Sequence, residues 1–165
     1  MFDQWLPWGL AGAAIASALV AGVFLAFSDF IMRSLGAARP AAGMEAMQEI
    51  NRKVYRSGFI VLLIAMVPVS LAIVACTPVF AGAMAASWSI AGAVLYILGV
   101  FAVTAAGNVP MNKRLDVLDP ADGDTRRYWR QYARRWTWLN HVRMAASAGS
   151  AICYLAAAML AGQAA

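Results

Sequence analysis

The sequence predicts an all-α integral membrane protein: a four-helix bundle with short amphipathic helices on one side of the membrane. Of its 165 residues, 62% are hydrophobic and only 13% are charged. A soluble domain of this length has too much surface for its volume to bury so many apolar side chains. Charged residues are also absent from three long stretches, 4–28, 57–112 and 144–165. A spanning helix needs about 20 apolar residues, so these stretches should hold one, two and one helices.

We expect one membrane domain over residues 1–165, with four spans. Their approximate ranges are 7–28, 57–77, 86–107 and 141–162. The first span is expected to be retained, because MFDQW carries an acid and no base and the apolar run exceeds that of a signal peptide. The second and third spans are expected to be joined by a turn within 76–88, where Pro78 and Gly82 interrupt the pattern.

Positive charge is confined to two connections between the spans. The first contains Arg33, Arg39, Arg52, Lys53 and Arg56, and the second Lys113, Arg114, Arg126, Arg127, Arg130, Arg134, Arg135 and Arg143. The positive-inside rule places both connections in the cytoplasm and both termini outside. The expected location is therefore the plasma membrane, as a multi-pass protein of a bacterial inner membrane, with the basic surface contacting membrane lipids. The alternative, that RRYWRQYARRW binds nucleic acid, is less favoured, since a basic-aromatic run beside a span is typical of an interfacial helix.

The first basic connection has the pattern of an amphipathic helix. Met44, Met47, Asn51 and Val54 recur on one face, opposite charged residues. Asn51 is the polar member of this face, and a buried amide needs hydrogen-bond partners. It serves either as a structural hydrogen bond between helices or as part of a site.

The second basic connection begins with GNVPMNKRLD (107–116). Pro110 is expected to disfavour helix at Val109. One face would hold Tyr96, Thr104, Asn108 and Asn112 if the helix continued through. After the turn LDPADGD, a helix is expected to start near residue 125 and to continue into the fourth span.

A polar stripe runs along the last helix at spacings of three and four residues. Its members are Trp136, Asn140, Arg143, Ser147, Ser150 and Tyr154. Lipid cannot satisfy polar groups, so the stripe should face the interior of the bundle. The topology also brings polar residues from all four spans to the cytoplasmic level, namely Ser28, Asp29, Asn51, Asn108, Asn112, Asn140 and Arg143. We therefore expect a polar-rimmed pocket at the cytoplasmic mouth of the bundle.

Four motifs carry a resemblance to a known family: GVFLAFSDFIM in the first span, AMQEIN in the first connection, NVPMNKRL after the third span and WTWLNHVR at the start of the fourth. With these motifs in this order, the chain resembles the anthrone oxygenase-like family of small four-helix membrane proteins. The resemblance implies oxidation of an anthrone to an anthraquinone by molecular oxygen, without a metal or flavin, as in fungal polyketide pathways. The family's polar motif positions fall on Asn51, Asn108, Asn112, Trp136, Asn140 and Arg143.

Such chemistry needs a base, hydrogen-bond donors for a developing oxyanion and an apolar slot for a flat ring. His141 is the candidate base because histidine is the side-chain type that ordinarily changes charge near neutral pH, and Asp29 is the alternative if it is partly buried. Asn140 and Arg143 are the candidate donors. Binding of the substrate is assigned to Phe24, Ser28, Asn51, Asn108, Asn112 and Trp136, with Trp138 as a further wall.

Each of these residues also has a purely structural interpretation. His141 could be an interfacial histidine, and Arg143 could extend to lipid headgroups. Trp136 and Trp138 could anchor the membrane interface, and the asparagines could join helices.

Several functional classes are disfavoured by the residues that are missing. A bound metal needs several His, Cys or carboxylate ligands, whereas the chain has one His and two isolated Cys. A proton-coupled transporter normally has an acid in mid-membrane, and the spans contain none before Asp29.

Two hypotheses remain. One is a cofactor-independent monooxygenase acting on a flat phenolic or polyketide substrate. The other is a non-catalytic membrane scaffold, or a subunit that binds a lipid or quinone. A homo-oligomer is also conceivable, because Ala18 and Gly22 form a small-residue pair on the first span.

Overall fold

The computed structural model describes residues 2–123 and 125–164, and these residues form helices and short connections without a β-strand. In chain order the helices are α1 (Phe2–Ala26), η1 (Phe27–Ile31), α2 (Met32–Ala37), α3 (Pro40–Val54), α4 (Gly58–Phe80), α5 (Gly82–Val94), η2 (Leu95–Ala102), η3 (Thr104–Asn108), α6 (Val109–Asp116) and α7 (Thr125–Ala164), where η denotes a π-helix.

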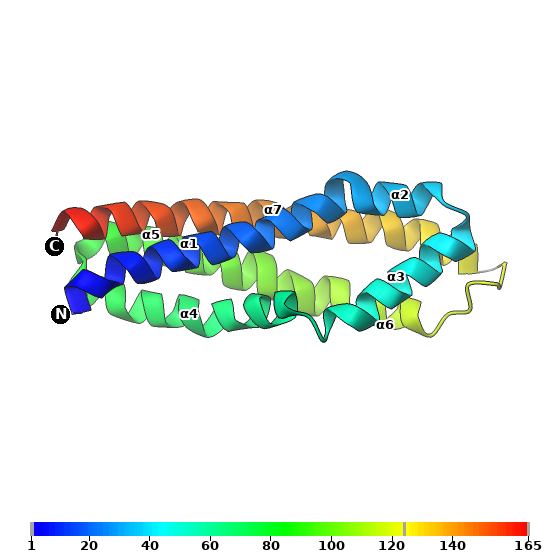
Figure 1. Cartoon of the computed structure of the whole chain (residues 1–165), viewed down its shortest axis with the longest axis horizontal. Helices are drawn as coiled ribbons and strands as arrows, with labels where there is room; N and C mark the ends of the chain where they lie inside the picture. The colour runs from blue at the N-terminus through cyan, green and yellow to red at the C-terminus, as the bar shows by residue number, and fades with distance from the viewer. Residues whose placement is uncertain (1, 124, 165) are drawn as a thin grey trace.

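Four continuous helical segments dominate the fold. Residues 4–37, 58–80, 82–116 and 125–163 are each long and apolar enough to cross a membrane. They lie side by side along the long axis of the molecule (Figure 1). The predicted fold class, an all-α bundle of the membrane type with short additional helices, is confirmed.

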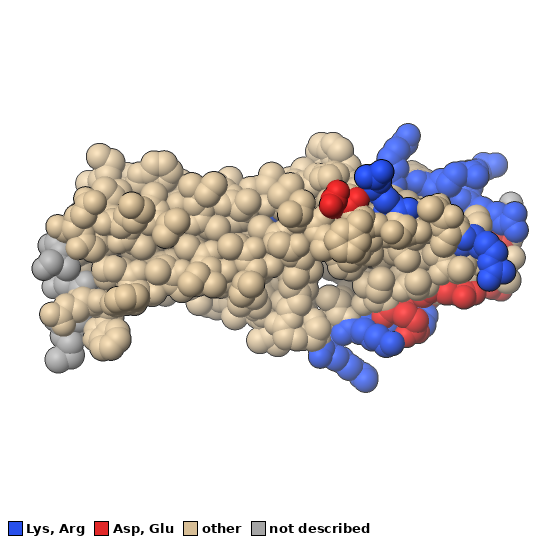
Figure 2. All heavy atoms as spheres, turned by 45° about the horizontal axis from the view of Figure 1, so that its top comes forward, with Lys and Arg blue, Asp and Glu red and all other residues tan. Residues whose placement is uncertain are grey.

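The two ends of the bundle differ in charge. Both termini lie at one end, whereas α2, α3, α6 and the start of α7 form the other (Figure 1). Lys and Arg side chains gather at this second end, and the remaining surface in view is almost free of charge (Figure 2). The uncharged section is therefore the part of the molecule suited to lipid, and the charged end is suited to water and headgroups.

The turn between α4 and α5 is very short. Ala81 is the only residue between the two helices, and Gly82 has a φ of 77°, a conformation that favours glycine. Gly82 thus interrupts the chain as predicted. Pro78 instead lies inside α4, because a proline removes only one hydrogen bond and the following amides still find acceptors.

The helix break expected before Pro110 does not occur. The third segment stays helical through η3 into α6, and Pro110 is near the start of α6, where a missing N–H is tolerated. The Val109 amide bonds to the Thr104 carbonyl, the wider spacing of a π-helix. Asn112 therefore remains in line with the third spanning segment. The first segment also extends beyond residue 28, to Ala37.

Hydrogen bonds join the helices inside the uncharged section. Tyr154 Oη donates to Ser70 Oγ at 2.7 Å, and Ser147 Oγ donates to the Ser17 carbonyl at 2.8 Å. All members of the polar stripe on α7 are buried: Trp136, Asn140, Arg143, Ser147, Ser150 and Tyr154. The stripe faces the interior because lipid offers no partner for these groups.

A second core holds the charged end together. Gln48 Nε2 of α3 donates to the carbonyls of Leu115 and Leu118, both at 2.9 Å, and so fixes α3 against α6. Arg52 bonds to Glu49 and Asp116, and these hydrogen bonds raise the pKa of Arg52 above its ordinary value. Packed beneath are Met32, Met44, Met47, Leu115, Trp129, Tyr132 and Trp136.

The small-residue pair of α1 lies on the outside of the bundle. Ala18 and Gly22 are both exposed. Their position leaves this face open to a neighbouring helix, and the homo-oligomer remains a prediction.

Close packing between the third and fourth segments can be tested at Gly99. A Cβ built there would collide with the Cβ of Ala146, whereas a Cβ at Gly12 meets nothing within 4 Å. We expect Gly99→Ala to destabilise the protein by about 1–3 kcal/mol through overpacking. Gly12→Ala should leave stability unchanged or raise it by up to about 1 kcal/mol. Thermal unfolding midpoints in detergent measure both, and equal midpoints would contradict this packing.

Candidate functional site

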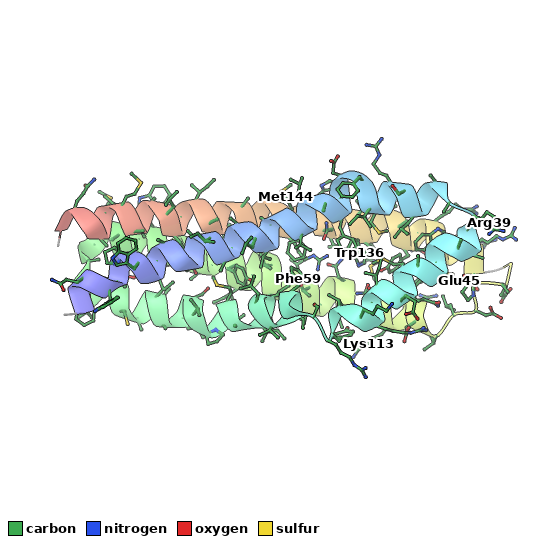
Figure 3. All side chains as sticks on the ribbon, in the orientation of Figure 1. Arg39, Glu45, Phe59, Lys113, Trp136 and Met144 are labelled. Carbon is green, nitrogen blue, oxygen red and sulfur yellow. The ribbon has the colours of Figure 1, made fainter. Side chains whose placement is uncertain are left out.

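A pocket, called the chamber below, lies where the uncharged section meets the charged end. Its volume is about 70 Å³. Its walls come from all four helical segments and are mainly apolar. The lining residues are Val23, Phe24, Phe27, Met47, Ile50, Asn51, Val54, Tyr55, Phe59, Ile60, Leu63, Thr104, Asn108, Val109, Asn112, Trp136 and Arg143. In Figure 3, Phe59 lies between α1 and α4, and Trp136 lies further toward the charged end.

A larger vestibule adjoins this inner chamber. It measures about 320 Å³ and is lined by Asn51, Arg52, Tyr55, Arg56, Asn112, Lys113 and Asp116. Asn51, Tyr55 and Asn112 line both spaces and so form their border. The surface in Figure 2 is hollowed between the uncharged section and the charged end. Tyr55 is 52% exposed, so both spaces reach the surface at this border. The vestibule extends from there toward charged residues, and the chamber extends toward apolar ones.

Arg143 is the central polar group of the chamber. It is 5% exposed, and its guanidinium lies 4.3 Å from the ring centroid of Phe24 and 5.1 Å from that of Trp136. Arg143 takes part in none of the ion pairs found among the described residues, which join Arg52 and Lys53 to Glu49 and Asp116. Arg143 is therefore a buried cation held by two aromatic faces, without a carboxylate partner in the described chain.

Asn140 fixes the position of this guanidinium. Its Oδ1 accepts a hydrogen bond of 2.6 Å from Arg143 Nη2, while Arg143 Nη1 donates to Thr104 Oγ1 at 3.3 Å. The Asn140 amide nitrogen donates to the Phe24 carbonyl and to Ser28 Oγ, both at 2.6 Å. This network ties α7 to the first segment and holds the guanidinium of Arg143 at the wall of the chamber.

Asn112 fixes Trp136 in the same way. Asn112 Oδ1 accepts hydrogen bonds from Tyr132 Oη at 2.8 Å and from Trp136 Nε1 at 2.9 Å. The indole ring held by this bond is one of the two faces against Arg143. Asn112 therefore acts on Arg143 through Trp136.

Three buried polar atoms of the lining have no protein partner. They are Asn51 Nδ2, Asn108 Oδ1 and Arg143 Nε. The orientation of Asn108 follows from its other contact, because its amide nitrogen faces the Trp136 carbonyl at 3.4 Å. Unpaired buried polar groups are costly and rare, and at a chamber wall they are typical of groups that contact a ligand or water.

The structure brings together most of the residues that the sequence singled out. Phe24, Asn51, Asn108, Asn112, Trp136 and Arg143 line the chamber. Ser28 and Asn140 are buried directly behind it. Phe24 and Trp136 present their faces to Arg143, so the predicted aromatic slot is occupied by a guanidinium.

The two candidate bases lie elsewhere. His141 and Asp29 are both exposed and do not line the chamber or the vestibule. Trp138 is 64% exposed and is not a wall of the chamber either. His141 follows Asn140 directly, and one residue turns a helix by about 100°, which takes its side chain out of the interior.

Sequence reasoning missed Tyr132, Phe59 and the π-helices. Tyr132 lies four residues before Trp136, so extending the stripe towards the N-terminus would have found it. Phe59 packs edge-on against Phe24, with ring centroids 5.7 Å apart. The π-helices η1 and η3 flank the chamber, as is common at functional sites, and no local pattern indicates them.

The described residues contain no group of three or more His, Cys, Asp or Glu side chains that could hold a metal ion. Cys76 is exposed and Cys153 is buried, and both are free thiols.

Comparison with known proteins gives one match. The family model described as anthrone oxygenase matches residues 52–153. This range contains Asn108, Asn112, Trp136, Asn140 and Arg143, whereas Phe24, Ser28 and Asn51 precede it. No curated protein and no solved structure matches the chain.

The double hydrogen bond at Asn112 makes a prediction about stability. Asn112→Leu leaves the Tyr132 hydroxyl and the Trp136 indole N–H without their acceptor, and we expect a loss of about 1–3 kcal/mol. Asn112→Asp keeps an acceptor oxygen and should recover most of that loss. Thermal midpoints of the two variants decide the matter. If Leu and Asp behave alike, the acceptor role of Asn112 is refuted.

Proposed function

Because the chain belongs to the anthrone oxygenase family, we propose that it oxidises a flat, membrane-soluble anthrone-type substrate with molecular oxygen and without a cofactor. The reaction takes place at the chamber and its vestibule. The observation that carries this proposal is Arg143, a buried guanidinium without a carboxylate partner among the described residues, at the wall of an apolar chamber.

An unpaired buried cation favours any process that brings negative charge beside it. An anthrone has a methylene group acidified by its ketone and two rings, and loss of one proton gives an anthrolate. The electrostatic attraction of a fixed guanidinium in a dry site stabilises such negative charge far more than it would in water. In this proposal the charge of Arg143 is the main factor that favours loss of the substrate proton.

The proton leaves through the vestibule. The chamber lining contains no carboxylate and no histidine. In this mechanism Arg143 lowers the pKa of the bound substrate, and water in the vestibule accepts the proton. Asn51 and Asn112, at the border of the two spaces, are placed to contact the substrate oxygen atoms.

A second candidate function rests on the charge of the vestibule. Arg56 and Lys113 line it and form no ion pair among the described residues. They would suit an anionic lipid headgroup or the oxygen atoms of a quinone. A non-catalytic subunit that binds such a ligand would show binding without oxygen consumption.

The orientation in the membrane follows from the charge distribution. We propose that the charged end faces the cytoplasm, with both termini outside, because positively charged connections are retained on the cytoplasmic side. The vestibule then opens at the cytoplasmic headgroup level of the plasma membrane. A membrane-soluble substrate could reach it there without crossing the bilayer.

The decisive experiment is oxygen uptake by the detergent-purified protein with emodin anthrone. Anthrones autoxidise, so a blank without protein sets the baseline. We expect uptake above the blank for the wild type and a loss of about 10²–10³-fold in Arg143→Met, the range found on removing one group that stabilises developing charge. The control is Arg134→Met, an exposed arginine on the same helix, which should retain the wild-type rate.

Folding of Arg143→Met is checked by its thermal midpoint. A methionine removes a buried charge that has no counterion but leaves Asn140 Oδ1 without its donor, so the loss of stability should not exceed about 1–3 kcal/mol. Uptake equal to the blank for the wild type would refute the oxygenase function. Binding of a lipid or quinone without uptake would then favour the second candidate.

The variants His141→Ala and Asp29→Asn test whether the base is one of these side chains or water in the vestibule. Both side chains are exposed and outside the chamber, so we expect both variants to consume oxygen at close to the wild-type rate. Initial rates at saturating substrate measure this. A loss of two orders of magnitude in either variant, with folding intact, would return that residue to the site.

A further inference from the structure

The two adjoining spaces differ in what they can hold. Binding sites for small organic molecules usually measure about 300–1,000 Å³, and the vestibule, at about 320 Å³, reaches that range. The inner chamber, at about 70 Å³, does not. A water molecule needs roughly 10–15 Å³ of such space, so the chamber has room for a few molecules of that size. By volume, a molecule of three fused rings suits the vestibule better than the chamber.

The walls of the inner chamber suit an apolar gas. Val23, Phe24, Phe59 and Leu63 line the chamber and do not line the vestibule. Molecular oxygen is more soluble in apolar media, including the lipid of a membrane, than in water. A mainly apolar chamber within a membrane bundle therefore favours the entry of oxygen.

The positive charge of Arg143 suits the negatively charged forms that oxygen takes when it is reduced. Arg143 lines the chamber, and its Nε atom is buried without a partner. A neutral oxygen molecule gains little from a cation, whereas superoxide or peroxide is strongly attracted. The pairing of an apolar chamber with an unpaired guanidinium favours oxygen entry and then stabilises its reduced form.

We propose that the inner chamber is the oxygen site and that the vestibule is the site of the flat substrate. Asn51, Tyr55 and Asn112 form the border at which the two reactants meet. This inference rests on the proposed oxygenase function and adds to it a division of the site between the two reactants. Arg143 lines the chamber and not the vestibule, so it stabilises the anthrolate across the border and the reduced oxygen at closer range.

The chemistry balances without a further reactant. The anthrolate transfers one electron to oxygen, and the resulting radical and superoxide combine to form a C–O bond at the former methylene carbon. The peroxide takes up the proton lost at the start. Loss of the remaining hydrogen of that carbon as a proton, with cleavage of the O–O bond, forms the second carbonyl and releases water. One anthrone and one oxygen molecule give one anthraquinone and one water.

The test fills the chamber without touching the vestibule. Val23→Phe adds a ring to the apolar wall of the chamber. Leu63→Phe adds one from another helix and replaces the first variant if that fails to fold. Val61→Phe is the matched control, because Val61 is 66% exposed on α4. Oxygen uptake is measured while the oxygen concentration and the emodin anthrone concentration are varied separately. Xenon NMR of the same proteins reports whether the chamber accepts an apolar gas, independently of turnover.

We expect the filled variants to raise the KM for oxygen several-fold, to leave the KM for the anthrone nearly unchanged and to lose xenon binding. Val61→Phe should match the wild type in all three. A rise confined to the KM for the anthrone, or a wild-type protein that turns over but takes up no xenon, would overturn the division of the site. Absence of turnover in the wild type would instead overturn the proposed function on which it rests.

Discussion

The buried guanidinium of Arg143 is the constraint around which the rest of the site is arranged. A cation inside an apolar bundle is costly unless its surroundings replace the water it has lost. Here the Asn140 amide, the Thr104 hydroxyl and the faces of Phe24 and Trp136 take over that role. None of them neutralises the charge. The described residues thus form a site that solvates a cation but leaves its charge available, which is the arrangement expected where an anion forms transiently.

The supporting groups belong to different helices, so the site also depends on the packing of the whole bundle. Asn140 joins α7 to the first segment, and Asn112 joins α6 to α7 through Tyr132 and Trp136. Gln48 holds α3 over α6. The π-helices lie in the first and third segments at the same level, where their wider turns change which residues face inward. A membrane bundle without a hydrophobic driving force between helices relies on such hydrogen bonds and on close packing, and here both meet at the chamber.

The division into a chamber and a vestibule follows from the boundary between two environments. In the uncharged section the helices pack on small residues and leave only a narrow interior. Beyond Val54 the chain leaves α3 and enters α4 after three residues, and the interior opens to the charged surface there. An apolar gas and a flat aromatic molecule would meet at a single border, with the guanidinium on the apolar side. The same geometry keeps bulk water away from the charge, which strengthens its effect.

The sequence by itself determined the features that depend on local pattern. Uncharged stretches, the placement of arginines and the polar stripe of α7 predicted the bundle, its charged end and a pocket at that end, because hydropathy, charge and helical period are properties of neighbouring residues. The tertiary structure alone decided which polar residues share the chamber. Asn140 and His141 are adjacent in the chain, yet one is fully buried and the other exposed, and the same contrast separates Ser28 from Asp29. Arg143 became the central group only because Phe24, Thr104 and Trp136, from three separate segments, converge on it. The rotation of each helix about its axis, the π-helical turns and the volume left between side chains are set by packing, which no single stretch of sequence contains.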